Sequence, residues 1–364
     1  MHYRRPSPAQ TGFSLIEIMV AMAIGLLTSL VIMQVFSAFE GQKRATTGTA
    51  DAQTNGSVAL YTIGRDLQMA GFGLLPTSDP VNVSPLECNP LPTWDDDNNI
   101  ATARITLDLS PVIITDGGAG AGATDSISVV YGTNPMGGIP TVISAIVATT
   151  ATVDNNLGCR VGDMALAISG SSCSATRVTG PTDIAIPPVA TIPPDITHIA
   201  LQDVVGIVAG SNLACLGTWN RTVFSVNNGN LEVNGVPRIA GIVNLQAQYG
   251  ISAAANNNTI TQWVNASAAP WNIVPLAIAD RNRIKAVRLA IVARNGSPEK
   301  EIVSTACDSL TAAAPTGLCA WAGSLASPAP SINLTNDANW ANYRYRVFET
   351  IIPLRNVIWS KATL

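Results

Sequence analysis

The chain opens with an apolar stretch over residues 13–39 that holds a single charged side chain, Glu17. These 27 residues exceed the roughly 20 that an α-helix needs to cross the hydrocarbon core of a bilayer. The pattern therefore predicts one membrane-spanning helix. A carboxylate inside such a helix costs about 2.5 kcal/mol or more, so we expect Glu17 to have a partner and a function.

A second helical pattern follows, because no proline occurs between residue 13 and residue 75. Leu60, Ile63, Leu67 and Ala70 are spaced by three and four residues, which places them on one helix face. We expect an amphipathic helix within residues 40–75 that docks on a sheet through this face. Four glycines interrupt the segment, at positions 41, 48, 56 and 64. Each costs about 1 kcal/mol relative to alanine, which predicts a locally loose helix middle.

After residue 75 the chain is rich in threonine, serine, asparagine, glycine and proline, and its apolar runs are short. Strands are predicted at residues 105–115, 126–131, 141–153, 163–168, 221–226, 231–233, 239–251, 283–294 and 342–352. A hairpin turn is expected at residues 227–230. In the last three strands apolar and polar residues alternate, which favours an antiparallel sheet with one face in water. On the final strand that wet face would carry Arg344 and Arg346. The predicted class is α+β, a long N-terminal helix packed on an antiparallel β-rich domain.

Six cysteines follow the apolar stretch: Cys88, Cys159, Cys173, Cys215, Cys307 and Cys319. An even number outside the cytoplasm predicts disulfides, with 15 possible connectivities. Proximity in sequence favours Cys159–Cys173 and Cys307–Cys319, which leaves Cys88–Cys215.

No motif indicates a metal, a cofactor or a catalytic site. The acidic run at residues 95–99 could offer oxygen ligands to calcium, but it lacks the glycine and distal glutamate of an EF-hand loop. His198 is the only histidine past residue 12, and no Cys-x-x-Cys occurs. Ser297 and Lys300 have the spacing of some acyl enzymes, yet they lie in a Gly-Ser-Pro turn. We therefore expect neither an enzyme nor a zinc site.

The start of the apolar stretch, Gly12-Phe13-Ser14-Leu15-Ile16-Glu17, resembles the signal of type IV prepilins and type II secretion pseudopilins. The resemblance implies that residues 1–12 are a leader, which Arg4 and Arg5 would keep cytoplasmic. It implies that a prepilin peptidase cleaves between Gly12 and Phe13 and methylates the new amino terminus. Glu17 would match the family's glutamate at the fifth mature position.

Physical chemistry gives Glu17 a role in assembly. Cleavage creates an ammonium group at Phe13, at the level of the bilayer, and an unpaired charge is costly there. Glu17 of one subunit can pair with the Phe13 ammonium of a neighbour. The pair lowers both costs and fixes the axial register between subunits.

Segments near both ends of the chain resemble the minor pilins of the PilW family. They are residues 63–72, 243–250, 284–294, 343–350 and 353–356. The resemblance implies four parts: a leader at 1–12, a transmembrane and assembly helix at 13–39, an amphipathic periplasmic helix at 40–75, and a disulfide-bonded head at 76–364. Residues 80–238 carry no such resemblance.

The implied function is that of a minor pilin in the bacterial inner membrane, with its C-terminal domain in the periplasm. It would prime type IV pilus assembly with other minor pilins and the major pilin, and lie in or near the fibre tip beside a large adhesin. Twitching motility, adhesion or DNA uptake would depend on that fibre.

Two alternatives stay open. The first is a minor pseudopilin of the J type in type II secretion, which shares the helix-plus-sheet plan. The second is a tip binding module whose Arg344 and Arg346 contact a surface or DNA. Net charge is −4 and becomes −6 without the leader, since the leader holds Arg4 and Arg5 and no acid. This acidity argues against bulk nucleic-acid binding.

Overall fold

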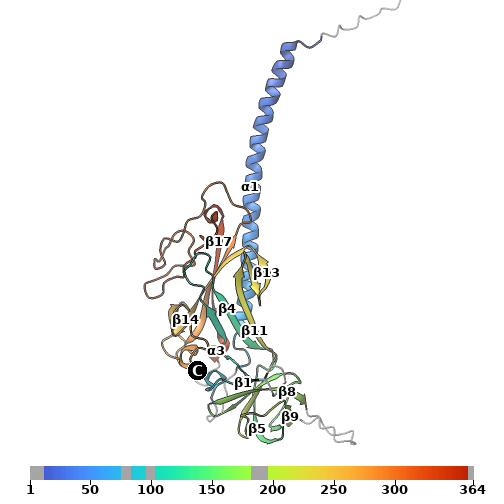
Figure 1. Cartoon of the computed structure of the whole chain (residues 1–364), viewed down its shortest axis with the longest axis vertical. Coiled ribbons are helices and arrows are strands. Elements are labelled where there is room, and N and C mark those ends of the chain that lie inside the picture. The colour runs from blue at the N-terminus through green and yellow to red at the C-terminus, as the bar shows by residue number, and fades with distance from the viewer. Residues whose placement is uncertain (1–11, 75–82, 96–102, 182–195, 360–364) are drawn as a thin grey trace, which may run out of the picture.

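A long helix stands out from one end of a β-rich head (Figure 1). The structure is a computed structural model that describes residues 12–74, 83–95, 103–181 and 196–359. Helix α1 (Leu15–Met69) runs unbroken for 55 residues. Within the described residues it is the one helix long and apolar enough to cross a membrane. The predicted α+β class is confirmed.

The second half of α1 packs on a four-stranded antiparallel sheet with the order β15-β14-β16-β17. Its strands are β14 (Ile242–Ser252), β15 (Ile260–Val264), β16 (Ile284–Arg294) and β17 (Tyr345–Pro353). Ile63, Leu67 and Ala70 are fully buried, and Leu60 packs against the same core. The predicted docking face is therefore confirmed. Gly71 and Gly73 adopt positive φ angles just after the helix and end it.

Two of the helix glycines make close contact with the sheet possible. A β-carbon at position 48 would lie 1.7 Å from Oδ1 of Asn295, and one at position 56 would lie 2.1 Å from Cε2 of Phe348. The four glycines predicted a locally loose helix middle. The structure shows no break there, because α1 is continuous through all four glycines. Their missing side chains bring the helix close to β17.

The other face of this sheet was predicted to be exposed to water, and that prediction is wrong. Residues 295–344 cover it, with Leu318, Trp321 and Ile332 packed against Ala290 and Val292 of β16. The polar side chains of β14 are buried beneath this cover, namely Asn244, Gln246 and Gln248. Nε2 of Gln248 donates to the Pro328 carbonyl at 2.7 Å. The alternation of apolar and polar residues along β14 thus reflects hydrogen bonding inside the protein and not exposure to water.

A second, five-stranded sheet shares the core with α1 and the first sheet, in the order β13-β12-β11-β4-β3. Its strands are β3 (Val112–Thr115), β4 (Ser126–Gly132), β11 (Trp219–Asn227), β12 (Asn230–Val233) and β13 (Val236–Ala240). The predicted hairpin turn is confirmed, since Asn228 and Gly229 both have positive φ between β11 and β12.

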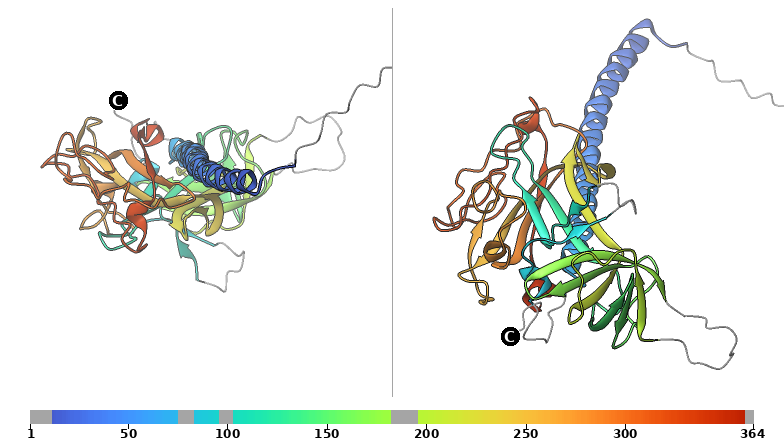
Figure 2. Two further views of the ribbon diagram at one scale, coloured as in Figure 1. Left: turned by 90° about the horizontal axis from the view of Figure 1, so that it is seen from above. Right: turned by 60° about the horizontal axis from the view of Figure 1, so that its bottom comes forward.

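A closed barrel is inserted between β4 and β11, in the strand order β10-β5-β6-β9-β8-β7. Its strands are β5 (Pro140–Val147), β6 (Thr150–Val153), β7 (Met164–Ser169), β8 (Ser172–Pro181), β9 (His198–Leu201) and β10 (Asn212–Gly217). It encloses its own apolar core. Figures 1 and 2 place it at the end of the head that is farthest from the free half of α1, the part before residue 40 that the head leaves uncovered.

Two predicted strands are each two strands. Residues 141–153 form β5 and β6, with a turn in which Ala148 has a φ of 54°. Residues 105–115 form β2 (Ile105–Thr106) and β3, and β2 pairs with β1 (Thr93–Trp94). The short helices are η1 (Pro85–Glu87), α2 (Ile278–Arg281), η2 (Trp340–Asn342) and α3 (Arg355–Trp359). Of the acidic run at 95–99, residues 96–99 lie outside the described residues; Asp95 is buried.

All six cysteines form disulfides, in the pairs Cys88–Cys173, Cys159–Cys215 and Cys307–Cys319. The third pair is as predicted, and the other two correct the prediction. Cys173 is the second residue of β8, next to the turn where the Asn89 N–H, beside Cys88, donates to the Ser171 carbonyl, whereas Cys215 lies in β10. Strand order thus overrides closeness in sequence.

Candidate assembly site

The candidate assembly site lies at the start of α1, where Ser14 is the N-cap and Glu17 occupies the third helical position. Ser14 has an extended backbone, with φ −71° and ψ 144°. Its N–H donates to Oε2 of Glu17 at 2.9 Å. This is a capping box, which satisfies an N–H group that the helix leaves without a partner. In the isolated chain Glu17 therefore caps its own helix.

Glu17 and Phe13 line the same shallow hollow, with Ile18, Ala21 and Met22 completing its wall. Phe13 is 86% exposed. A β-carbon at position 12 would have no heavy atom within 4 Å, so a side chain there would meet nothing in the described structure. The structure thus brings together the three predicted residues Gly12, Phe13 and Glu17 at one accessible point.

The free half of α1 presents its apolar side chains outward. Large examples include Leu15, Met19, Ile24, Leu27, Ile32 and Phe36. Two of its hydroxyls are satisfied locally, since Thr28 and Ser29 donate to carbonyls four residues earlier. Such a helix needs lipid or other helices around it. Glu17 lies in the first turn, where the positive end of the helix dipole stabilises its carboxylate.

Family comparisons agree with this arrangement. The prokaryotic N-terminal methylation motif matches residues 7–33, and the family described as Type IV Pilus-assembly protein W matches residues 216–356.

The chain is similar to the PilW family over the matched residues.

It is a type IV pilus-associated minor pilin, and the family is a structural pilus component rather than an enzyme family. The apolar helix and pilin signal indicate membrane anchoring and association with the pilus. No curated protein and no solved structure matches the chain.

The PilW match runs from the end of β10 through β17 and the first two residues of α3. Nearly the whole barrel therefore lies outside the two matched segments. The predictions from sequence missed this module, since its strands are short and several, such as β8 with Ser172, Ser174 and Thr176, are polar.

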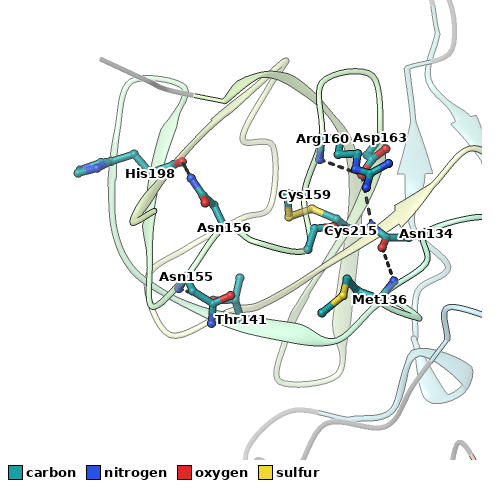
Figure 3. Close-up of a disulfide and its surroundings, with 11 residues drawn as sticks. Asn134, Met136, Thr141, Asn155, Asn156, Cys159, Arg160, Asp163, His198 and Cys215 are labelled. Carbon is teal, nitrogen blue, oxygen red and sulfur yellow. Dashed lines mark hydrogen bonds between the residues drawn. A yellow bond between two sulfur atoms is a disulfide. The ribbon is translucent and has the colours of Figure 1, made fainter. Parts of the chain in front are cut away.

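A hydrogen-bonded joint fixes the barrel to the head (Figure 3). Asn134, just after β4, donates to Oδ2 of Asp163 at 3.3 Å and to the Gly158 carbonyl. Asp163 also accepts from the Arg160 N–H at 2.9 Å. Burial raises the pKa of the Asp163 carboxyl, although these hydrogen bonds oppose the shift. The Cys159–Cys215 disulfide closes the same region.

A second set of contacts joins the barrel to the β1–β2 hairpin. Arg104 donates to the Thr93 and Ala175 carbonyls and pairs with Asp203, Nη1 to Oδ2, at 2.9 Å. The Arg177 guanidinium lies over the Trp94 ring, 5.3 Å from its centroid. With Cys88–Cys173, these contacts hold the barrel in one orientation.

Arg344 and Arg346 were predicted on the water-exposed face of the sheet, but they lie on the side of β17 that faces α1, where they line a hollow together with α1 residues. Arg344 forms an ion pair with Glu299, and Arg346 is exposed. Cys307, Asp308 and Cys319 lie within 4.8 Å of one another, but both sulfurs belong to a disulfide and offer no thiolate to a metal.

Proposed function

We propose that the chain is cleaved after Gly12, methylated at Phe13, and then primes type IV pilus assembly from the bacterial inner membrane. Residues 13–39 would serve as the membrane and assembly helix and residues 40–75 as the amphipathic helix, with the head in the periplasm. The supporting observation is that Phe13 and Glu17 line one exposed hollow on a helix that its own head leaves uncovered.

Assembly would exchange one partner of Glu17 for a stronger one. In the single chain its carboxylate accepts from a neutral N–H, that of Ser14. A neighbour's Phe13 ammonium would instead give a charge-assisted hydrogen bond, which is roughly twice as strong as a neutral one. The exchange favours association because the ammonium otherwise stays unpaired in an apolar setting.

The barrel supports a place in or near the fibre tip. A pilin leaves the membrane head first, so the end of the head away from the free half of α1 points toward the tip. The barrel occupies that end and extends beyond the end of α1 (Figure 2). A subunit stacked above would meet it, whereas a subunit at the tip has nothing above it.

The partners in this proposal are the prepilin peptidase, other minor pilins, the major pilin and a large tip adhesin. Twitching motility, adhesion or DNA uptake would depend on the chain through the fibre that it helps to start. The proposal requires no direct contact with nucleic acid.

Glu17→Ala tests the proposal. If the chain were only anchored, the change would be harmless, since it removes a charge from an apolar helix. If Glu17 pairs with a neighbour's Phe13, the ammonium loses its partner, at a cost of about 3–5 kcal/mol. We expect mature protein at normal levels, few surface pili and weak co-purification with other minor pilins.

Gln34→Ala is the matched control, because it removes another exposed polar side chain from the same half of α1. It should leave piliation and partner recovery unchanged. Wild-type piliation and partner recovery in the Glu17→Ala strain would contradict the proposal.

A further inference from the structure

A polar hollow of about 630 Å³ opens between the middle of α1 and the start of β17. Thr46 and Gln53 line it from α1, and Asn295 and Ser304 line it from the segment after β16. Arg344 and Arg346 close its remaining side. Gly48 lies beside it, because the Asn295 side chain, just after β16, fills the space that a side chain at Gly48 would need.

The hollow carries positive charge. No carboxylate is among its lining residues. Arg344 binds Glu299 through Nε and Nη2. Arg346 forms no ion pair within the described part of the chain and is exposed. Guanidinium groups bind phosphate through paired N–H donors, and the Gln53 amide can add another. The chemistry therefore suits a phosphate-bearing anion.

Its position suits a membrane surface. Thr46 follows the last residue of the apolar stretch, Phe39, by seven residues, or about 10 Å along a helix. The stretch is about 40 Å long against a hydrocarbon core of about 30 Å. Tilting accommodates such excess length and lowers the head toward the bilayer. In Figure 1, α1 leaves the head beside β17.

We propose that this hollow binds the phosphate of an anionic phospholipid headgroup while the pilin is held in the membrane before assembly. The inference rests on the membrane-held state of the proposed function. The hollow is built partly from the same helix that enters the bilayer. This continuity with the membrane helix favours a lipid headgroup, rather than an acidic segment of another pilin, as the bound group. Bound phosphate would fix the rotation of the head about the membrane normal and release it on extraction.

The test uses the mature full-length protein in nanodiscs of phosphatidylcholine alone or mixed with phosphatidylglycerol. Backbone hydrogen exchange is followed in residues 46–53, 295–304 and 342–346. Exchange should be slower by roughly fivefold in the anionic discs, the change expected from one arginine near an anionic surface. Arg346→Gln should abolish the difference. Arg355→Gln, an exposed arginine beyond the opposite end of β17, should preserve it.

Four results would overturn the inference. Equal exchange in both discs would do so, as would a lipid-dependent difference that survives Arg346→Gln. Equal slowing by inorganic phosphate in phosphatidylcholine discs would show a site for free anions rather than for the membrane. Loss of co-purifying minor pilins in Arg346→Gln, with lipid-dependent exchange intact, would indicate a protein contact.

The same experiment separates the two proposals. A mature chain that enters both discs without a difference overturns the lipid site alone. A chain that enters neither disc removes the membrane-held state, and the lipid site with it.

Discussion

The carboxylate of Asp125 accepts a hydrogen bond from the backbone N–H of Ala247 at 2.8 Å, and this contact joins the two sheets of the head. Its other oxygen accepts from the Gly117 N–H at 3.0 Å. Thr124 and Leu245 add hydrogen bonds in both directions beside it. The segment before β4 thus docks on the part of β14 that precedes its pairing with β15.

This contact predicts a pH-dependent stability. Burial, opposed by the two backbone hydrogen bonds, raises the pKa of Asp125 from 3.8 to about 7. Between these values the folded chain binds the proton more strongly than the unfolded chain. The contribution is therefore fully present below about pH 4 and is lost as the pH rises to about 7. The free energy of unfolding should fall across this range by a few kcal/mol.

Denaturant unfolding of wild type and Asp125→Asn between pH 4 and 8 measures the effect. The variant should lack this part of the slope, whereas Asp154→Asn, at an exposed position on the barrel, should keep it. Parallel curves for wild type and Asp125→Asn would rule out the titration of this carboxyl as the cause.

Glycines on α1 should differ in their response to alanine. Gly56→Ala places a methyl group against the Phe348 ring, and overpacking of this kind costs about 1–3 kcal/mol. Gly41→Ala meets nothing within 4 Å and should stabilise the helix by up to about 1 kcal/mol. Thermal unfolding of both variants checks the opposite signs. Similar shifts would show that helix propensity, and not contact with β17, governs position 56.

Processing should fail when the leader junction is blocked. Gly12→Val places a branched side chain at the bond that the peptidase must reach, so the precursor should accumulate uncleaved. Mass spectrometry of the wild-type mature protein should find a methylated Phe13 at its start. A start at Met1, or beyond residue 39, would exclude the prepilin signal.

The disulfide connectivity is open to direct mapping. Peptides from the unreduced protein should link Cys88 with Cys173 and Cys159 with Cys215. Cys159→Ser should leave one alkylatable thiol, at Cys215, and lower stability by about 2–4 kcal/mol. Cys307→Ser should free Cys319 and leave the barrel linkages intact. A peptide joining Cys159 to Cys173 would contradict the strand order of the barrel.

The parts of the fold that were predicted correctly depend on residues that are close together in the sequence. The register of Gly12, Phe13 and Glu17 lies within six consecutive residues, and the docking face of α1 lies within three helical turns. The match to the N-terminal methylation motif and the long helix therefore followed from neighbouring residues alone.

Features that depend on distant segments did not follow. Gln248 is buried because residues near Pro328 cover it, and nothing beside Gln248 in sequence indicates that cover. Ala290 and Val292, on the neighbouring strand β16, partly indicated this cover. A sheet face exposed to water rarely carries apolar residues at two successive positions. The pairing of Cys88 with Cys173 needed the barrel, whose polar strands gave little periodicity.

The insertion point of the barrel has a consequence for how this pilin can change. Gly132 and Trp219 are paired neighbours on β4 and β11, so the chain leaves the head and returns to it at adjacent points. A short turn could close that gap without altering the register of either strand. The barrel is thus an inserted module with adjacent entry and exit points. Its surface can be exchanged or lost while the helix and the sheets that hold it keep their sequence.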